Sequence, residues 1–392
     1  MTFEDIKKLD DEYVMHTYGR YQLAIESGKS ATCYAPDGKA YIDFTSGIGV
    51  NCLGWCDAGW IAAVTAQLHK IQHFSNYFYC ESASVLAEKL VSLSGLKRVF
   101  FGNSGAEANE GAIKLARKYS FDKYGEGRAT VITLENSFHG RTVTTLAATG
   151  QDVFHQYFFP FTEGFKYAPA NDLDAVKAAI TPDVCAIMAE PIQGEGGVNM
   201  LDVEFVKALR ALCDERDLLL IFDEVQTGVG RTGSFFGFEA FGVKPDIVTL
   251  AKGLGGGLPI GAFIAGEKVE STLGGGMHGS TFGANPVVTA GAVEVVNRVS
   301  DPAFLTEVNR KGEALIAAVM AQNPSKVKSV RGRGLMIGFA VEGNPKDYLH
   351  DCADAGLLVL TAGKDVIRLL PPLTISDEEI AAGAAILAKV LA

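Results

Sequence analysis

Residues 249–262, TLAKGLGGGLPIGA, place a single lysine, Lys252, among five glycines. The residues before it, 244–251 (KPDIVTLA), contain a short apolar run that is typical of a buried strand. Lysine is almost never fully buried unless it is paired, and so many glycines cost backbone entropy without adding packing. A lysine directly after a core strand therefore indicates a buried ion pair or an amine that does chemistry.

The same kind of apolar run recurs along the middle of the chain. Continuous apolar stretches occupy residues 97–101, 129–134, 184–189, 217–223, 246–251 and 260–266. Several are separated by stretches with helical periodicity, among them 106–120 and 203–216. Continuously apolar strands that alternate with amphipathic helices predict a mostly parallel sheet covered on both faces, and thus an α/β fold.

The two ends of the chain have a different pattern. Residues 31–44 alternate around a Pro-Asp-Gly turn, which predicts a hairpin. After Pro286 come two long helical stretches, then strands and a last helix near 377–391. This pattern predicts a smaller α+β domain that begins within the helix after Pro286. We therefore expect a large domain over 56–285 and a small domain over 286–392.

Composition disfavours several classes of function. The chain has 392 residues and a formal net charge of −11, which disfavours a surface that binds nucleic acid or an anionic membrane. No stretch approaches the roughly 18 apolar residues of a membrane span, and the charged start MTFEDIKKLDDEY lacks the apolar core of a signal sequence. The seven cysteines are scattered without a CxxC pair, so we expect reduced thiols, a cytoplasmic location and no metal site.

Polar residues follow the apolar strands at the position where ligands bind in open α/β sheets. After the strand 97–101 stand Ser104 and Glu107, whose spacing fits a helix capping box. The same turn could instead seat a phosphate on Ser104 and on the free N–H groups of Gly105 and Ala106. Both interpretations place a helix start at this edge of the sheet.

Three more loops bring aromatic, basic and acidic groups to strand ends. Phe138, His139 and Arg141 follow the strand 129–134 and offer a flat ring and a guanidinium fork. The loop EPIQGEGG at 190–197 holds two acids and three glycines, a composition that is also common in loops without a ligand. Asp223 ends a wholly apolar strand, where a carboxylate needs a partner.

Together these groups match the needs of one cofactor. Pyridoxal phosphate requires a lysine to carry it, an acid at its pyridine nitrogen, a phosphate seat and a ring to stack on. A buried Asp223–Lys252 ion pair is the structural alternative. Two nucleotide interpretations fail: SGKS at 27–30 has Leu23 where a P-loop needs its first glycine, and GRGLMIG at 332–338 is not G-x-G-x-x-G.

The sequence resembles the class III aminotransferases of the pyridoxal-phosphate fold type I superfamily over nearly its whole length. The resemblance is carried, in order, by NSGAEANEGAIKLAR, FHGR, EPIQGEGG, DEVQTGVGRTG, AKGLGGGLPIGA and HGSTFGANP. Within the class, TYGRYQLAIESG, IDFTSGIGVNCLG and HFSNYFY are similar to the acetylornithine aminotransferase subfamily. The resemblance implies the type I architecture, with residues 1–55 packing against the small domain.

The resemblance also implies a site for pyridoxal 5'-phosphate. Lys252 would carry the cofactor and then act as the general base, and Asp223 would pair with the ring nitrogen. Gln226 would bond the ring hydroxyl, and Phe138 would stack on the ring. The implied cofactor-binding residues are Ser104, Gly105, Ala106, Phe138, Asp223, Glu224, Val225, Gln226, Lys252 and Thr281.

Substrate and partner contacts are implied in the same way. Arg141 would bind the substrate α-carboxylate, with Ser280 beside it. Arg368 would take the α-carboxylate of 2-oxoglutarate or glutamate, and Glu195 would pair with Arg368 when the other substrate is bound. Thr281 would reach the phosphate of the neighbouring subunit's cofactor, so the active unit would be a homodimer.

The subfamily transfers an amino group from N2-acetylornithine to 2-oxoglutarate, giving N-acetylglutamate 5-semialdehyde and glutamate in arginine biosynthesis. Ornithine, succinylornithine and 4-aminobutyrate stay open as donors, as does a mutase of the same fold. A serine hydrolase built on Ser104 fits poorly, because Ala106 stands where a nucleophile elbow needs glycine. A binding protein without catalysis would have little need for Lys252.

One segment departs from the family pattern. The family usually has Gly-His-x-His-Pro after the leucine, whereas residues 54–58 are Gly-Trp-Cys-Asp-Ala. We expect this segment to be structural.

Overall fold

The computed structural model describes residues 1–392 and is built around a seven-stranded sheet. Its strand order is β4-β12-β11-β10-β7-β5-β6, and only β12 runs antiparallel to its neighbours. The predicted mostly parallel sheet is therefore confirmed. The strands are β4 (Arg98–Gly102), β5 (Thr130–Leu134), β6 (Phe165–Ala168), β7 (Val184–Ala189), β10 (Leu219–Asp223), β11 (Ile247–Leu250) and β12 (Gly261–Ala265).

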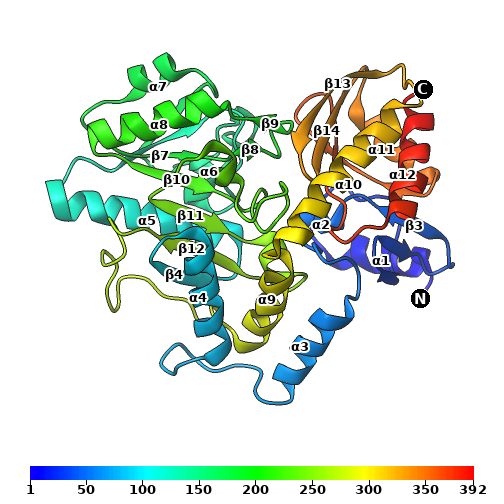
Figure 1. Ribbon diagram of the computed structural model, residues 1–392, viewed down its shortest axis with the longest axis horizontal. Coiled ribbons are helices and arrows are strands. Elements are labelled where there is room, and N and C mark those ends of the chain that lie inside the picture. Colours follow the sequence, from blue (N-terminus) through cyan, green and yellow to red (C-terminus); the bar gives the residue numbers. More distant parts are fainter.

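Helices cover both faces of this sheet (Figure 1). On β10, Leu219 and Ile221 pack in one apolar cluster with α5 (Gly105–Tyr124), whereas Phe222 packs in another with α8 (Val203–Arg216). Because both faces of the strand are buried, both sets of alternating side chains must be apolar. This explains why the central strands are continuously hydrophobic.

The elements not yet named are short or flank the sheet, except α1 (Phe3–Tyr13), which lies in the lobe that holds both ends of the chain (Figure 1). None of the chain's helices combines the length and the apolar character needed to cross a membrane. The helices and turns are α1 (Phe3–Tyr13), α2 (Ser46–Gly49), α3 (Ala58–Leu68), α4 (Glu81–Ser94), α6 (Val143–Ala148), α7 (Leu173–Ala179), α9 (Pro286–Val299), η1 (Asp152–Phe154), η2 (Gly237–Phe241) and η3 (Lys252–Gly255), and the two-stranded sheet is β8 (Ile192–Gln193) with β9 (Asn199–Met200).

Both ends of the chain lie in a second lobe, on one side of the molecule (Figure 1). One sheet there has the order β13-β14-β17-β16, and another has the order β1-β2-β3-β15. The predicted hairpin over 31–44 is confirmed, because β2 and β3 pair antiparallel. β3 also pairs in parallel with β15, which sets Ile42 opposite Leu357. The elements of this lobe are β1 (Ser27–Lys29), β2 (Thr32–Tyr34), β3 (Ala40–Asp43), α10 (Pro302–Met320), β13 (Val327–Arg333), β14 (Met336–Val341), α11 (Pro345–Asp354), β15 (Leu357–Leu358), β16 (Leu360–Ala362), β17 (Val366–Leu369) and α12 (Asp377–Val390).

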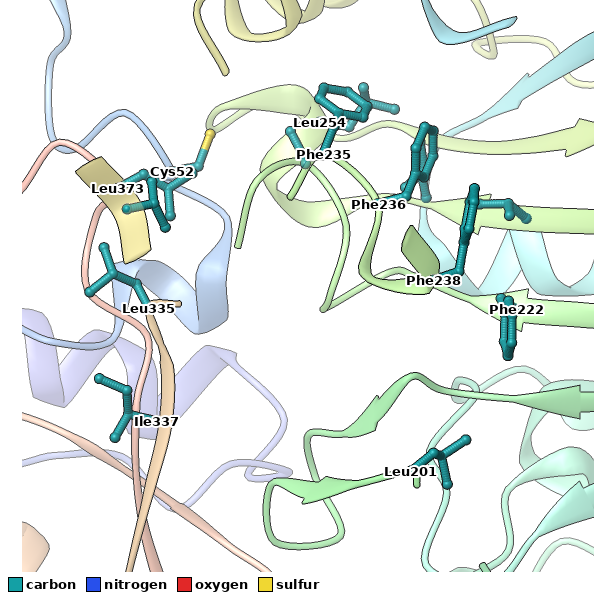
Figure 2. Close-up of a cluster of buried hydrophobic side chains, with 14 of the residues drawn as sticks. Cys52, Leu201, Phe222, Phe235, Phe236, Phe238, Leu254, Leu335, Ile337 and Leu373 are labelled. Atoms are coloured by element: carbon teal, nitrogen blue, oxygen red, sulfur yellow. The ribbon is translucent and has the colours of Figure 1, made fainter. Parts of the chain in front are cut away.

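The two lobes share one apolar core (Figure 2). Phe222 and Phe238 belong to its large-sheet end, and Ile337 and Leu373 belong to its small-domain end. Leu254, in the turn η3, is fully buried in the same cluster. The backbone that follows Lys252 is thus fixed by packing rather than by the glycines around it.

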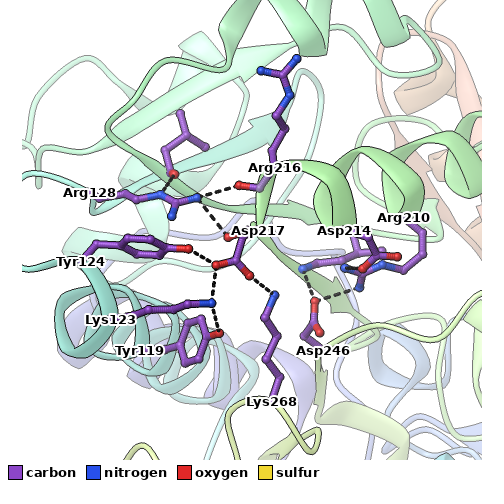
Figure 3. A network of polar contacts seen from close by, with 12 residues as sticks. Tyr119, Lys123, Tyr124, Arg128, Arg210, Asp214, Arg216, Asp217, Asp246 and Lys268 are labelled. Carbon is purple, nitrogen blue, oxygen red and sulfur yellow. Dashed lines mark hydrogen bonds and ion pairs between the residues drawn. The ribbon is translucent and has the colours of Figure 1, made fainter.

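A polar network fastens the amino ends of the central strands, opposite the edge where the strands' carboxyl ends open (Figure 3). Asp217, just before β10, accepts hydrogen bonds from Lys123 Nζ (2.6 Å) and Lys268 Nζ (2.8 Å). Asp246, just before β11, pairs with Arg210 Nη1 at 2.8 Å. Lys123 and Arg210 join the helices α5 and α8 to strand starts, and Lys268 joins the turn after β12 to them, while the opposite strand ends stay free to build a site.

The segment that departs from the family pattern makes structural contacts. Trp55 Nε1 donates to Asp43 Oδ2 at 3.0 Å, and the indole lies so close to Gly28 that a Cβ added there would come within 2.6 Å of it. Asp57 caps α3 and pairs with Arg298 Nη1 at 2.6 Å. These contacts agree with the structural role expected from the sequence.

Candidate active site

The carboxyl ends of the central strands open into a cavity of about 450 Å³. Its walls are formed by residues that directly follow β4, β5, β7, β10 and β11. The structure therefore brings together the loops that the sequence singled out. The predicted site residues that line this cavity are Ser104, Gly105, Ala106, Phe138, Arg141, Asp223, Val225, Gln226 and Lys252.

Asp223, the last residue of β10, is buried and richly hydrogen-bonded. Its Oδ2 accepts from Asn109 Nδ2 at 2.7 Å and lies 2.8 Å from His139 Nδ1. Its Oδ1 accepts from the Val225 N–H at 3.0 Å and from the Thr249 hydroxyl at 3.4 Å. These four contacts fix the Asp223 carboxyl group in place, and a carboxyl oxygen beside His139 Nδ1 favours the tautomer with the ring proton on that nitrogen.

Two of these partners were not assigned a role from the sequence. The sequence pattern points to His139 only as a neighbour of Phe138, and it does not point to Asn109. The available signal was that Asn109 is a polar residue on the inward face of α5, where it is 1% exposed. Such an amide needs buried partners, and it finds one in Asp223.

Lys252 begins the turn η3 directly after β11. Its backbone has a φ of 45°, in the left-handed region that costs a non-glycine residue roughly 1–2 kcal/mol. Burial lowers the pKa of the Lys252 amine, although the carboxylates of Glu195, Asp223 and Glu190 act in the opposite direction. A lowered pKa increases the neutral fraction of the amine, which is the form that acts as nucleophile or base.

The amino end of α5 faces the cavity. Ser104 is the N-cap, since its Oγ accepts from the Glu107 N–H at 3.1 Å. The other half of the predicted capping box is wrong: the Glu107 carboxylate accepts from the N–H and Nδ2 of Asn103, one residue earlier than expected. The N–H groups of Gly105 and Ala106 open the helix without intrahelical acceptors and form an anion seat.

Phe138 and Arg141 stand between this cavity and a neighbouring cleft of about 1010 Å³, since both residues line both spaces. The guanidinium carbon of Arg141 lies 4.2 Å from the ring centroid of Phe154 and 5.4 Å from that of Phe138. Arg141 is exposed and belongs to none of the chain's ion pairs. The Arg141 guanidinium is therefore free to bind a carboxylate.

Glu195 and Arg368 meet at the edge of the cleft. Arg368 Nη1 donates to Glu195 Oε1 at 2.7 Å, and Nη2 donates to Oε2 at 3.2 Å. Gln226 bridges them, because its Oε1 accepts from Arg368 Nη1 at 3.0 Å and its Nε2 donates to Glu195 Oε1 at 3.3 Å. Although burial alone would raise the pKa of Glu195, the Arg368 guanidinium holds it below its usual value.

Besides Glu195 and Arg368, three predicted site residues lie outside the cavity. The Glu224 side chain accepts from the N–H groups of Gly237 (2.6 Å) and Phe238 (2.7 Å) and so closes the turn η2, where burial raises its pKa to about 7. Ser280 and Thr281 lie in a loop that does not line the cavity, and Thr281 is exposed. No group of three or more histidine, cysteine, aspartate or glutamate side chains is placed to hold a metal ion.

The cavity fits a flat ring that carries an anionic group. A Cβ added at Gly105 would come within 2.7 Å of Val225 Cγ1, so only glycine lets the anion seat of α5 approach this closely. A buried carboxyl group, a partly buried lysine and an aromatic ring surround the same space. These groups are the ones needed to hold pyridoxal phosphate.

Comparison with known proteins agrees with this site. The family model for aminotransferase class-III matches residues 13–391. The acetylornithine aminotransferase of Haemophilus ducreyi is 57% identical over 394 residues, which cover 100% of this chain and 99% of that protein. The one from Methanocaldococcus jannaschii is 45% identical, with 97% and 96% covered.

Solved structures extend the comparison. The ornithine aminotransferase from Toxoplasma gondii superposes with a TM-score of 0.95 at 33% identity, covering 100% of this chain and 95% of that one. The N-acetylornithine aminotransferase from Stenotrophomonas maltophilia has a TM-score of 0.84 at 38% identity, with 98% and 97% covered. With the family model matched over nearly its whole length, the chain belongs to the class-III aminotransferases.

Proposed function

We propose that this chain uses pyridoxal phosphate to transfer the amino group of N2-acetylornithine to 2-oxoglutarate. The products are N-acetylglutamate 5-semialdehyde and glutamate, a step of arginine biosynthesis. The observation that carries the proposal is the meeting of Lys252, Asp223 and the start of α5 around one cavity, with the Glu195–Arg368 pair beside it. Relatives named acetylornithine aminotransferase, at 57% and 45% identity, support this donor.

When bound, pyridoxal phosphate supplies an electron sink for the charge that develops at the substrate carbon. The N–H groups of Gly105 and Ala106, with the Ser104 cap, would hold the phosphate at the positive end of α5. Phe138 would stack on the ring. Asp223 would pair with the ring nitrogen and keep a proton there, since four hydrogen bonds fix its carboxyl group in a buried place.

Lys252 would carry the cofactor between turnovers and, once released, would move a proton at the substrate carbon. Burial lowers the pKa of its amine, so the free side chain is available in the neutral form. A base held at the reacting atom typically contributes about 10²–10⁴-fold in rate. The fixed turn η3 keeps the side chain at this position through each cycle.

One site binds two different acids in turn, with the help of the movable Glu195–Arg368 pair. Arg141 binds the α-carboxylate of acetylornithine, and Ser280 contacts the same substrate. Arg368 binds the α-carboxylate of 2-oxoglutarate or glutamate, and Glu195 masks it when the uncharged acetylated tail is present. Masking avoids an unpaired buried cation, which is costly. An exchange of two acids favours a transferase over a mutase that retains its amine.

Ornithine is the second candidate donor. The TM-score of 0.95 to an ornithine aminotransferase favours it, but that score measures the whole backbone and not the few side chains that read the tail. Steady-state rates with acetylornithine, ornithine, succinylornithine and 4-aminobutyrate, each with 2-oxoglutarate, test the choice. We expect the highest kcat/KM for acetylornithine, and a higher value for any of the other three would overturn the assignment.

We further propose a homodimer with shared sites, in the cytoplasm. Tyr77 and Tyr79 are 95% and 103% exposed, and nearby Asn76 Nδ2 donates to the carbonyl of Ser280. This apolar segment beside the loop of Thr281 supports a subunit contact. Seven unpaired cysteines support a reducing compartment.

Mixing two inactive variants tests the shared site. In a dimer of Lys252→Ala and Thr281→Ala subunits, one site has an intact Lys252 and an intact Thr281 from the other chain. Activity should therefore return on mixing, whereas sites confined to single subunits would stay impaired. Sedimentation of the unmodified protein measures the dimer itself.

A further inference from the structure

A second carboxyl group, that of Glu190, lies beside Asp223 at the rim of the cavity. Glu190 follows β7 directly, as Asp223 ends β10, and these two strands are hydrogen-bonded neighbours with Ala189 opposite Phe222. Glu190 is 5% exposed and lines the cavity. The proposed roles above do not use it.

The two carboxyl groups have very different partners. Asp223 receives four hydrogen bonds, two of them from Asn109 and His139. Glu190 receives one, from the Phe138 N–H to its Oε2 at 3.0 Å, and it belongs to none of the chain's ion pairs. Its second oxygen has no partner within the protein.

Two neighbouring buried carboxyl groups seldom both ionise, and the charge goes to the one that accepts more hydrogen bonds. The titratable groups around Glu190 are Asp223, Glu195, Lys252 and His139, which follow four different strands. Burial and the negative charge of Asp223 raise the pKa of Glu190 well above its usual range, and the Phe138 N–H and Lys252 oppose this only in part. The geometry and the electrostatics therefore both favour the protonated form of Glu190.

We propose that Glu190 is an uncharged carboxylic acid that positions Phe138 through one oxygen and presents the proton on its other oxygen to an acceptor atom on the ring bound in the cavity. Its neutrality has a second effect. An ionised Glu190 would raise the pKa of Lys252, so a protonated Glu190 helps to keep that amine neutral. The ring contact rests on the proposed function, whereas the protonation state does not.

The protonation state is measured on the protein without substrate. An infrared difference spectrum between the unmodified chain and Glu190→Gln, at neutral pH, should contain the carbonyl stretch of one protonated carboxylic acid. Glu224 contributes a similar band, but it is common to both proteins and cancels. The exposed Glu204, 84% accessible at its side chain, provides the control variant Glu204→Gln, which should remove no such band.

Unfolding gives an independent readout. Because the folded state keeps a proton on Glu190 that the unfolded state loses, the free energy of unfolding should fall as pH rises from the usual glutamate pKa toward the raised one. Glu190→Gln cannot lose that proton, so it should gain stability relative to the unmodified protein as pH rises. Equal pH profiles for the two proteins would show that Glu190 is already ionised.

Activity of the loaded enzyme completes the test. Glu190→Ala, which loses both contacts, should lower kcat/KM by about tenfold or more, and Glu190→Gln should recover most of it. The Gln variant should also retain its rate to higher pH than the unmodified enzyme. A Gln variant that is as slow as Ala, that fails to fold or that shows no lost carbonyl band would overturn the proposal, whichever donor the panel favours.

Discussion

Arg368 of β17 and Glu195, in the loop after β8, join the two lobes through two hydrogen bonds of 2.7 and 3.2 Å. Arg368 is 2% exposed, whereas the Glu195 side chain is 30% exposed. The arginine is thus fixed in a strand and the carboxylate lies on a glycine-flanked loop. If one member moves during the reaction, this asymmetry favours Glu195.

We predict that the two members affect different half-reactions. Glu195→Ala should leave Arg368 open, so glutamate should bind more tightly and acetylornithine should react more slowly. Arg368→Ala should impair chiefly the 2-oxoglutarate half, by roughly 10²-fold or more, because a charge-assisted two-bond contact is lost. Single-turnover absorbance of each half-reaction measures both effects, and equal losses in both halves would identify a purely structural ion pair.

Asp223→Asn should slow turnover while the fold persists. The change removes the negative charge opposite the ring nitrogen and turns an NH₂ group toward the donors of Asn109 or His139. We expect kcat to fall by about 10²–10³-fold or more, as for other buried electrostatic contacts in active sites. Circular dichroism checks folding, and a near-normal rate in a folded variant would contradict the role.

Lys252→Ala should abolish measurable turnover and the visible absorbance of the lysine-bound cofactor, while pyridoxal phosphate still binds noncovalently. A matched control is Lys389→Ala, an exposed lysine on α12 with no ion pair, which should behave like the unmodified enzyme. If the Lys252 variant kept even a few per cent of the rate, Lys252 would not have the proposed catalytic role.

Asp217→Asn should destabilise the protein at neutral pH without affecting catalysis. Burial would raise the pKa of Asp217, but hydrogen bonds from Lys123, Lys268 and Tyr124 outweigh burial and lower it. A lowered carboxyl pKa stabilises the fold above the unfolded pKa, and this contribution is lost as pH falls through the folded pKa. The melting temperatures of variant and parent should therefore differ at pH 7 and converge in acid.

Asparagine is a suitable substitute there, because residue 217 has a φ of 51° and asparagine tolerates the left-handed region. The exposed Asp174, 94% accessible at its side chain, gives the control Asp174→Asn, for which no pH-dependent gap is expected. A gap at position 217 that stays constant with pH would mean that packing, not charge, is lost.

Trp55→Phe should lower stability by about 1–3 kcal/mol, because the buried Asp43 carboxylate loses one donor. Urea unfolding measures this change, and kcat/KM should stay close to that of the parent. A large loss of kcat/KM at unchanged stability would instead give the Gly-Trp-Cys-Asp-Ala segment a part in substrate binding.

Continuously apolar strands could be predicted from the sequence, including the edge strand β4, whereas edge strands with exposed polar positions could not. β10 is apolar at every position up to Asp223 because helices cover both of its sides. β6 is an edge strand, with Lys166 and Tyr167 partly or largely exposed, and β13 is an edge strand with Lys328 and Ser329 exposed. Such strands lack the continuous apolar signal.

The residues of the candidate site also differ in how well the sequence predicts them. Lys252 and Asp223 stood out because a polar residue after an apolar strand is conspicuous, but the next residue, Glu224, was assigned to the same cavity. Successive side chains of an extended chain point to opposite sides, and Glu224 accordingly turns into η2. Asn109 reaches Asp223 only through the approach of α5 to β10, which no local pattern reports.

The pairing of β3 with β15 sets an order of events during synthesis on the ribosome. All strands of the seven-stranded sheet lie between Arg98 and Ala265, so that sheet can form while the last part of the chain is still untranslated. Ile42, by contrast, must wait for Leu357, and at about 5–20 residues per second the roughly 300 residues between them take about 15–60 s to emerge. The first strands to leave the ribosome are therefore among the last to complete their pairing. During that interval the unpaired edge of β3 is the part of the nascent chain most exposed to aggregation.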